Sequence, residues 1–195
     1  MRPNVFVAPP HGLEHFHFGF HYALADLFWM RSLQDFDFCE STGQQSKCRQ
    51  SGWLFQMLDV ITDLDPKFRV AYSAGGLALT VIISDVTGAS RIFDKGVQAF
   101  PKNWPLLYRA AYHALYEERN FVKAADLMKQ AGQNGGPDWV FELAGRLYTQ
   151  SGQRELAERM LSEMDSSNLD EEMKEKMRQR FQEKIQSLNH EIPGT

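Results

Sequence analysis

The sequence has little of what marks membrane proteins, secreted precursors or nucleic-acid-binding proteins. No apolar run approaches the roughly 20 residues that a membrane helix needs, and the opening MRPNVFVAPP lacks the apolar core of a signal peptide. The net charge is -4 over 195 residues, so no excess of basic side chains is available for nucleic acid. We therefore expect a protein that does not insert directly into a membrane and does not bind DNA or RNA.

Cysteine is scarce, because the chain has only Cys39 and Cys48, which flank the polar loop ESTGQQSK. Gly43 and the serine and threonine content of this loop allow a tight reversal, so a disulfide across it is geometrically reasonable. Such a bridge would contribute about 2–3 kcal/mol and would indicate an oxidising compartment. The alternative is two unrelated thiols beside a surface loop. Two cysteines with no further ligand nearby do not make a zinc site.

The motifs of common enzyme classes are also absent. The chain has no G-x-G-x-x-G or G-K-[ST] phosphate loop, no G-x-S-x-G nucleophile motif and no catalytic cysteine signature. A close crossing of helices explains Gly75 and Gly76 better than a phosphate site does. We interpret Asp59, Asp63 and Asp65 as solvating the end of a helix rather than as a cation site. We therefore expect a protein that is not an enzyme and has no cofactor.

What the sequence does contain is a regular spacing of prolines. Helix-like apolar segments end at Pro66, Pro101 and Pro137, with intervals of 35 and 36 residues. Proline disfavours the helical conformation of the residue before it, and a period of this length is typical of arrays of helix pairs. The sequence therefore predicts an all-α fold, built as a helical-repeat solenoid of about four helix pairs.

Apolar residues at intervals of three and four predict the individual helices. The expected segments are 20–33, 53–64, 72–83, 89–100, 106–117, 121–131, 139–149, 154–164 and 169–189. Segment 20–33 is apolar on most sides, which predicts that it is buried. Segment 72–83 is rich in β-branched residues, and the repeat period decides for helix.

These helices predict three regions along the chain. We expect an irregular aromatic arm over residues 1–19, and a repeat domain over 20–164. A polar capping helix and its tail follow over 165–195, with a narrow apolar stripe.

Large and small residues over 104–164 form a pattern that resembles tetratricopeptide repeats. The matching positions are Leu107, Ala110, Ala111, Ala114, Ala124, Met128, Ala131 and Pro137, then Leu143, Ala144, Leu147, Gly152, Ala157, Leu161 and Met164. The likeness covers about residues 20–164. It implies a right-handed solenoid, in which the first helix of each pair lines a concave groove that binds another protein.

The chain also resembles a family of uncharacterised bacterial repeat proteins of the cell envelope. The residues behind this likeness are Glu14, His15, Phe16, Phe18 and Gly19, together with the segment Trp53–Phe68. It implies a periplasmic or cell-envelope location, reached after removal of a leader. A cytoplasmic location is the alternative.

On the tetratricopeptide pattern, a set of residues faces the groove and forms the predicted partner-binding site. Its members are Tyr108, Arg109, Tyr112, Leu115, Tyr116, Phe141, Arg146 and Tyr148. Tyrosine brings a rigid apolar ring and a hydroxyl, which suits an extended peptide or a partner helix, and arginine suits a carboxylate. The alternative is that the tyrosine stripe packs within the protein and recognises nothing external.

Histidines gather near the N-terminus, within eleven residues, at His11, His15, His17 and His21. Neutral imidazoles are good ligands for zinc, copper or nickel. Phe16, Phe18 and Phe20 alternate with them, which favours an extended segment that presses its aromatic rings inward and leaves the histidines outside. We expect no metal site here.

The function predicted from the sequence is that of a non-enzymatic scaffold or adaptor, which binds a peptide or partner helix of another protein in a concave groove. Two alternatives stay open. One is a structural subunit of a cell-envelope assembly that uses the convex face or the arm. The other is a metal-binding protein built on the histidine arm. The identity of the partner and the oligomeric state are not predicted.

Overall fold

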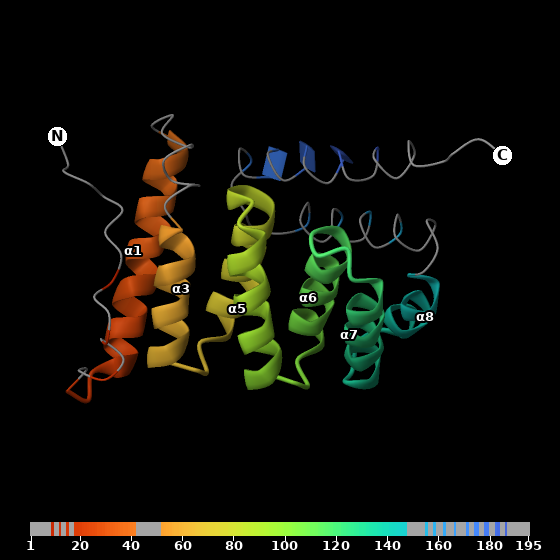
Figure 1. Ribbon diagram of the computed structural model, residues 1–195, viewed down its shortest axis with the longest axis horizontal. Helices are drawn as coiled ribbons and strands as arrows, with labels where there is room; N and C mark the ends of the chain where they lie inside the picture. The colour runs from red at the N-terminus through yellow and green to blue at the C-terminus, as the bar shows by residue number, and fades with distance from the viewer. Residues whose placement is uncertain are drawn as a thin grey trace. The chain divides into compact units, whose positions relative to one another are not determined.

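The structure is a computed structural model in which every described element is a helix (Figure 1). It describes residues 18–41, with side chains as far as residue 34, and residues 52–147. It also describes isolated positions, namely 9, 12, 15, 155, 158, 162, 166, 171, 174, 175, 178, 179, 182, 183 and 186. No strand occurs among these residues, which confirms the all-α prediction for them. Within the same residues, no helix combines the length and the apolarity needed to cross a membrane.

The chain divides into two compact units, Met1–Pro101 and Lys102–Thr195. The boundary falls at Pro101, one of the three prolines whose spacing predicts the repeat. The described elements of the first unit are α1 (His21–Ser41), α3 (Trp53–Leu64), η1 (Ala71–Gly75), α4 (Gly76–Ala78), η2 (Leu79–Ile83) and α5 (Val86–Ala99). Those of the second unit are α6 (Trp104–Tyr116), α7 (Phe121–Gln133) and α8 (Asp138–Arg146).

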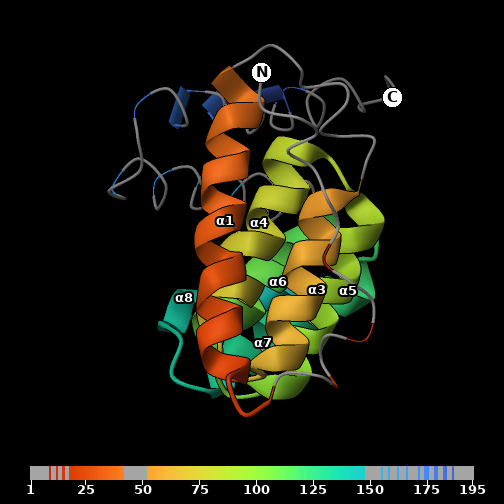
Figure 2. The same ribbon diagram turned by 90° about the vertical axis from the view of Figure 1, so that its left-hand side faces the viewer.

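Helix α1 packs beside α3 (Figure 2) and is longer than predicted. It continues eight residues past Leu33, to Ser41. The reason is that no glycine or proline interrupts the chain between Gly19 and Gly43. The backbone of Cys39 therefore lies in a helix and not in a loop. Its side chain, and all of Cys48, lie outside the described residues, so their disulfide stays a prediction.

The segment 71–83 is helical, as the repeat period predicts, despite its β-branched residues. Two wide π turns, η1 and η2, flank the short α4. All of Leu79–Ile83 is buried, so the apolar run reflects burial on every side rather than a strand. The Thr80 hydroxyl donates to the Gly76 carbonyl at 2.9 Å, which satisfies this buried polar group inside the helix.

Two glycines allow this helical stretch to approach a neighbour on each side. A Cβ atom on Gly75 would lie 2.6 Å from Cδ2 of Leu58 in α3. A Cβ atom on Gly76 would lie 2.8 Å from the tip of the Phe93 ring in α5. Neither position has room for a side chain, so segment 71–83 is held closely between α3 and α5. The interpretation of these glycines as a close helix crossing is confirmed.

Tyr72 ties the same stretch to the turn that follows α3. Its ring is buried, and its hydroxyl donates to the Pro66 carbonyl at 3.2 Å. Burial raises the pKa of Tyr72 to about 12, and the carboxylates of Asp63 and Asp65 add to the shift. The neutral phenol is therefore the form that the folded protein holds at ordinary pH.

We expect the stability of the first unit to depend on Tyr72 above pH 10. In the unfolded chain this phenol ionises near pH 10, and in the folded chain near 12. The neutral phenol of Tyr72 therefore contributes fully to the free energy of unfolding below pH 10. This contribution, about 2–3 kcal/mol, is lost as the pH rises from 10 to 12. Urea unfolding of wild type and Tyr72→Phe at several pH values measures this. Wild type should lose stability faster than the variant between pH 10 and 12, and two parallel curves would contradict the assignment.

Side-chain caps fix where three of the helices begin. The capping residues are Asp85, Asn103 and Asn120, and each accepts from the backbone N–H three residues further on, at 2.9–3.1 Å. A cap of this kind contributes about 1 kcal/mol. Helix α5 begins at Val86, three residues before the predicted start at Ala89, because Asp85 supplies its cap.

In the second unit, α7 packs against both α6 and α8. A Cβ atom on Gly132 of α7 would lie 2.7 Å from Cβ of Phe141 and 3.0 Å from its Cα. The backbones of α7 and α8 therefore come close together at this glycine. The predicted helices 154–164 and 169–189 lie outside the described residues, apart from isolated positions.

Candidate functional site

The tyrosine stripe predicted to line a groove lies on α6, and its side chains are buried. Tyr108, Tyr112 and Tyr116 are 3%, 2% and 4% exposed. Leu115, another predicted member on this helix, is buried as well. The expectation that these side chains line an open surface is therefore corrected, because in the structure they pack inside the protein.

The buried tyrosines contact other aromatic rings. The centroids of Tyr112 and Tyr116 lie 4.7 Å apart, and Tyr108 meets Trp139 of α8 edge-on at 5.7 Å. Burial raises the pKa of Tyr112 well above its usual value, and the neighbouring Tyr116 adds to the shift. Such contacts stabilise the packing of the second unit.

Three other members of the predicted site keep some exposure. Phe141 on α8 is 50% exposed, and the Arg146 side chain is equally accessible. Arg146 forms an ion pair with Glu155, with 3.0 Å between Nη1 and Oε2. Arg109 is half-buried, and Tyr148 lies outside the described residues. The accessible remainder of the predicted groove is therefore on α8.

A cluster of charges that the sequence does not reveal joins α3 to α5. The Lys95 ammonium lies 2.8 Å from a carboxylate oxygen of Asp59 and 2.8 Å from one of Asp63. The Arg91 guanidinium lies over the Phe55 ring, 4.4 Å from its centroid. Asp59 and Asp63 thus bind Lys95, and do not only solvate the end of a helix. Each partly exposed pair contributes at most about 1 kcal/mol to stability, and together the pairs link α3 to α5.

A second charged cluster surrounds the turn between α6 and α7. His113 is buried, and its Nε2 lies 3.7 Å from Oε1 of Glu118. The Lys123 ammonium donates to both carboxylate oxygens of Glu118 at 3.0 Å. These contacts connect the end of one helix to the start of the next, which is a structural role.

The N-terminal histidines fall partly within the described residues. His15 is exposed, and His21 begins α1 with its ring 4.0 Å from that of Tyr22. His11 and His17 lie outside the described residues. Over the positions that the structure describes, no group of three or more His, Cys, Asp or Glu side chains is placed to hold a metal ion.

Two of the three phenylalanines next to these histidines, Phe18 and Phe20, do not press inward as predicted, and Phe16 lies outside the described residues. Phe18 is 88% exposed and Phe20 is 67% exposed. The chain turns at this point, with positive φ angles of 48° at Phe18 and 86° at Gly19, so the backbone is not extended at these two residues.

Exposed apolar side chains gather on α1 and the residues just before it. The described part of the chain has nine large hydrophobic residues that are exposed, and six of them form what we call the α1 apolar face: Phe18, Phe20, Tyr22, Leu27, Met30 and Leu33. Segment 20–33 was predicted to be buried on most sides, and this prediction is wrong.

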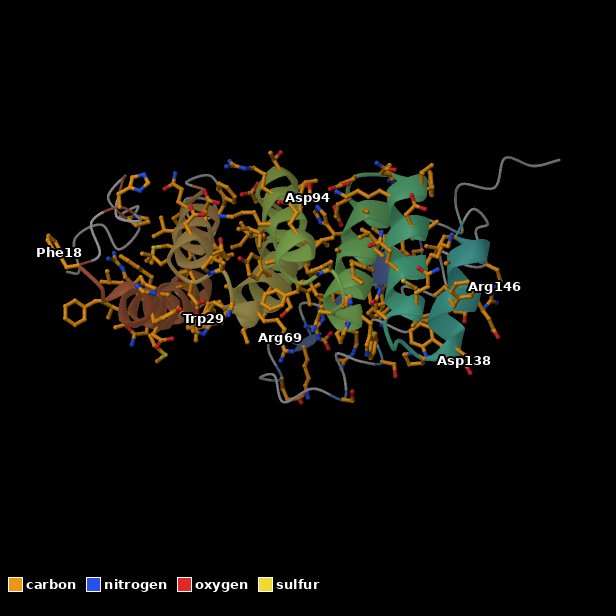
Figure 3. The ribbon with its side chains drawn as sticks, turned by 90° about the horizontal axis from the view of Figure 1, so that it is seen from below. Phe18, Trp29, Arg69, Asp94, Asp138 and Arg146 are labelled. Carbon is orange, nitrogen blue, oxygen red and sulfur yellow. The ribbon has the colours of Figure 1, made fainter. Side chains whose placement is uncertain are left out.

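Helix α1 packs on α3 and buries few of its described side chains. Over residues 21–34, where the side chains of α1 are described, Ala25 and Ser32 are fully buried. Trp29 packs its ring 5.7 Å from that of Phe68, and Figure 3 shows Phe18 and Trp29 on opposite sides of the helix. The α1 apolar face therefore lies away from the packed side. Exposed apolar side chains gathered on one helix are typical of sites of interaction.

The chain matches no protein-family model, no curated protein and no solved structure. The α1 apolar face is therefore identified as the candidate site by the exposure of its side chains and by their position on one helix.

Proposed function

We propose that this protein is a non-enzymatic interaction protein that binds another protein chain through the α1 apolar face. The observation that carries the proposal is the concentration of six exposed large apolar residues on one helix and the turn before it. Burying such residues against a partner removes apolar area from water, at roughly 25 cal/mol per Å². An exposed helix face of this kind suits a partner helix or an apolar groove.

The tetratricopeptide-like solenoid is part of the same proposal. In the first unit α1 packs on α3 and segment 71–83 on α5, and in the second unit α6 packs on α7. Successive packed pairs with short connections are what a helical repeat requires. Such a scaffold presents its surface already folded, so little conformational freedom is lost when a partner binds.

The predicted groove is the second candidate surface, and Phe141 and Arg146 are its accessible members. The Phe141 ring suits a partner that carries an apolar side chain, whereas the Arg146 guanidinium is already paired with Glu155. The buried tyrosine stripe of α6 would support this surface rather than touch the partner. The α1 apolar face is the stronger candidate, because it offers more exposed apolar residues.

The test is affinity capture from a lysate of the source cell, with four forms of the full-length chain. These are wild type, Leu27→Gln/Met30→Gln, Phe141→Gln and Val122→Gln. Glutamine keeps helix propensity and adds no charge. Val122 on α7 is 59% exposed, similar to Leu27 at 61%, so its variant is a matched control. Because all four positions are exposed, circular dichroism and the melting temperature should be unchanged.

We expect a captured protein to be retained by wild type and by the Val122 and Phe141 variants, and lost with the Leu27/Met30 variant. Loss only with the Phe141 variant would move the working surface to the groove. Equal capture by all four forms would overturn the role of both surfaces.

A further inference from the structure

We propose that the α1 apolar face binds a second copy of this chain, with the two α1 helices forming a short parallel coiled coil. This inference rests on the proposed function of that face as an interaction surface. It names the partner, and it also names the direction in which the partner helix runs.

Three of the exposed apolar residues, Phe20, Leu27 and Met30, fit a heptad repeat, and Tyr22 and Leu33 lie beside it. Phe20, Leu27 and Gln34 occupy positions seven residues apart, and Ala23 and Met30 lie between them, also seven apart. These are the a and d positions of a coiled-coil seam, and all five residues are exposed. Phe20 belongs to the start of the helix, since its carbonyl accepts from the Leu24 N–H at 2.9 Å.

The buried side of α1 follows the same heptad. Ala25 and Ser32 are seven residues apart, at the f positions, directly opposite the seam. One helix therefore has two surfaces of equal period. The f side packs on α3 within the chain, and the a/d side remains available for a partner helix.

The charges beside the seam favour a parallel arrangement. Asp26 occupies position g and Arg31 position e, so they flank the seam on opposite sides, five residues apart. In a parallel pair, a g side chain faces the e side chain five residues further along the other helix, so Asp26 would face Arg31 of the partner subunit. An antiparallel pair brings equal flanks together instead, so Asp26 would face a g residue of the partner helix, which is Asp26 or Leu33 according to register, and would gain no opposite charge. Gln34 at an a position adds a polar group of the kind that fixes register.

The small size of the seam determines the dimer affinity that we expect. Two heptads bury less than the roughly 800 Å² per partner of a standard interface, so the dimer should be weak, with a dissociation constant of micromolar or higher. Because α1 is already held as a helix by α3, association does not require the helix to fold first. The dimer should therefore appear and disappear within an accessible range of concentration.

Sedimentation equilibrium of the full-length chain tests the proposal. Wild type and the Val122→Gln control should associate reversibly as concentration rises, and Leu27→Gln/Met30→Gln should stay monomeric. Asp26→Arg should weaken association by roughly tenfold, because like charges then face each other across the seam. The exchange variant Asp26→Arg/Arg31→Asp should restore it to within about threefold, which a merely structural role for either residue would not do.

Direction is tested by cross-linking. In a parallel pair the two copies of residue 34 face each other, so Gln34→Cys, in a chain whose native cysteines are replaced by serine, should form an intermolecular disulfide on mild oxidation. A dimer that does not cross-link there overturns the parallel arrangement.

Two results would overturn the choice of a second copy as the partner. One is a monomer at all concentrations, and the other is association unaffected by the Leu27/Met30 variant. Lysate capture that still depends on Leu27 and Met30 would then leave the proposed function standing with a different protein as the partner.

Discussion

The variant Gly132→Ala is expected to lower the free energy of unfolding by about 1–3 kcal/mol. The added Cβ atom would lie 2.7 Å from Cβ of Phe141 and 3.0 Å from its Cα. Both atoms belong to or adjoin the backbone of α8, so no rotation of a side chain relieves the clash, and α7 and α8 must separate. Alanine favours a helix over glycine by about 1 kcal/mol, which offsets only part of this loss. Urea unfolding followed by circular dichroism measures the difference.

The matched control is Gly145→Ala, in the helix that faces Gly132. Gly145 lies within α8 and has no atom within 4 Å of the position that a Cβ would occupy. The same substitution should therefore stabilise the protein by up to about 1 kcal/mol, through helix propensity alone. Opposite signs for the two variants support the close approach of α7 and α8. A Gly132→Ala protein as stable as the Gly145→Ala protein would contradict it.

The second large effect is expected from Phe93→Ala, which should lower the free energy of unfolding by about 3–5 kcal/mol. Phe93 is a large side chain of α5 and is fully buried. Removing its ring leaves a cavity beside segment 71–83 that the surrounding helices can only partly fill. If the Phe93→Ala protein is too unstable to measure, Phe93→Leu should give a smaller loss in the free energy of unfolding. Denaturant unfolding at constant pH gives the value.

A double-mutant cycle shows whether the ring of Phe93 is what Gly76 accommodates. Gly76→Ala alone should destabilise the protein, because the new Cβ would lie 2.8 Å from that ring. In a Phe93→Ala background the ring is gone, and the same change should cost little or stabilise the helix. The two substitutions should therefore couple by about 1 kcal/mol or more. If the two changes in the free energy of unfolding are additive, the Phe93 ring is not what limits the space at Gly76.

The sequence predicts most of the described helices well because the local signals agree there. Segment 53–64 matches α3 residue for residue, since an apolar period of three and four ends at a proline. Helix α6 begins at Trp104, two residues before the predicted start of segment 106–117, because Asn103 caps it and a proline lies in its first turn. The end of α1 was misplaced, because the apolar pattern fades after Leu33 while nothing in the chain breaks the helix before Gly43.

The candidate site was harder to predict, because an apolar stripe does not reveal what covers it. Tyr108, Tyr112 and Tyr116 have the same spacing whether they line a groove or fill a core, and in the structure they are buried. For α1 the prediction failed in the opposite way, because residues predicted to be buried are exposed. A helix that is apolar on most sides suggests full burial, and here one side remains exposed.

Contacts that are distant in sequence could not be predicted either. Lys95 and Asp59 are separated by 36 residues, and no local pattern connects them. Their ion pair depends on how α3 and α5 approach each other.

The glycines of segment 71–83 also decide how this part of the protein can open. Leu58 of α3 packs against Gly75, and Phe93 of α5 packs against Gly76. If either α3 or α5 moves away, segment 71–83 becomes exposed to solvent. Segments coupled in this way open together, as one cooperative unit. Helix α1 packs on α3 and exposes its apolar face, so we expect local fraying of α1 to leave the glycine crossings closed.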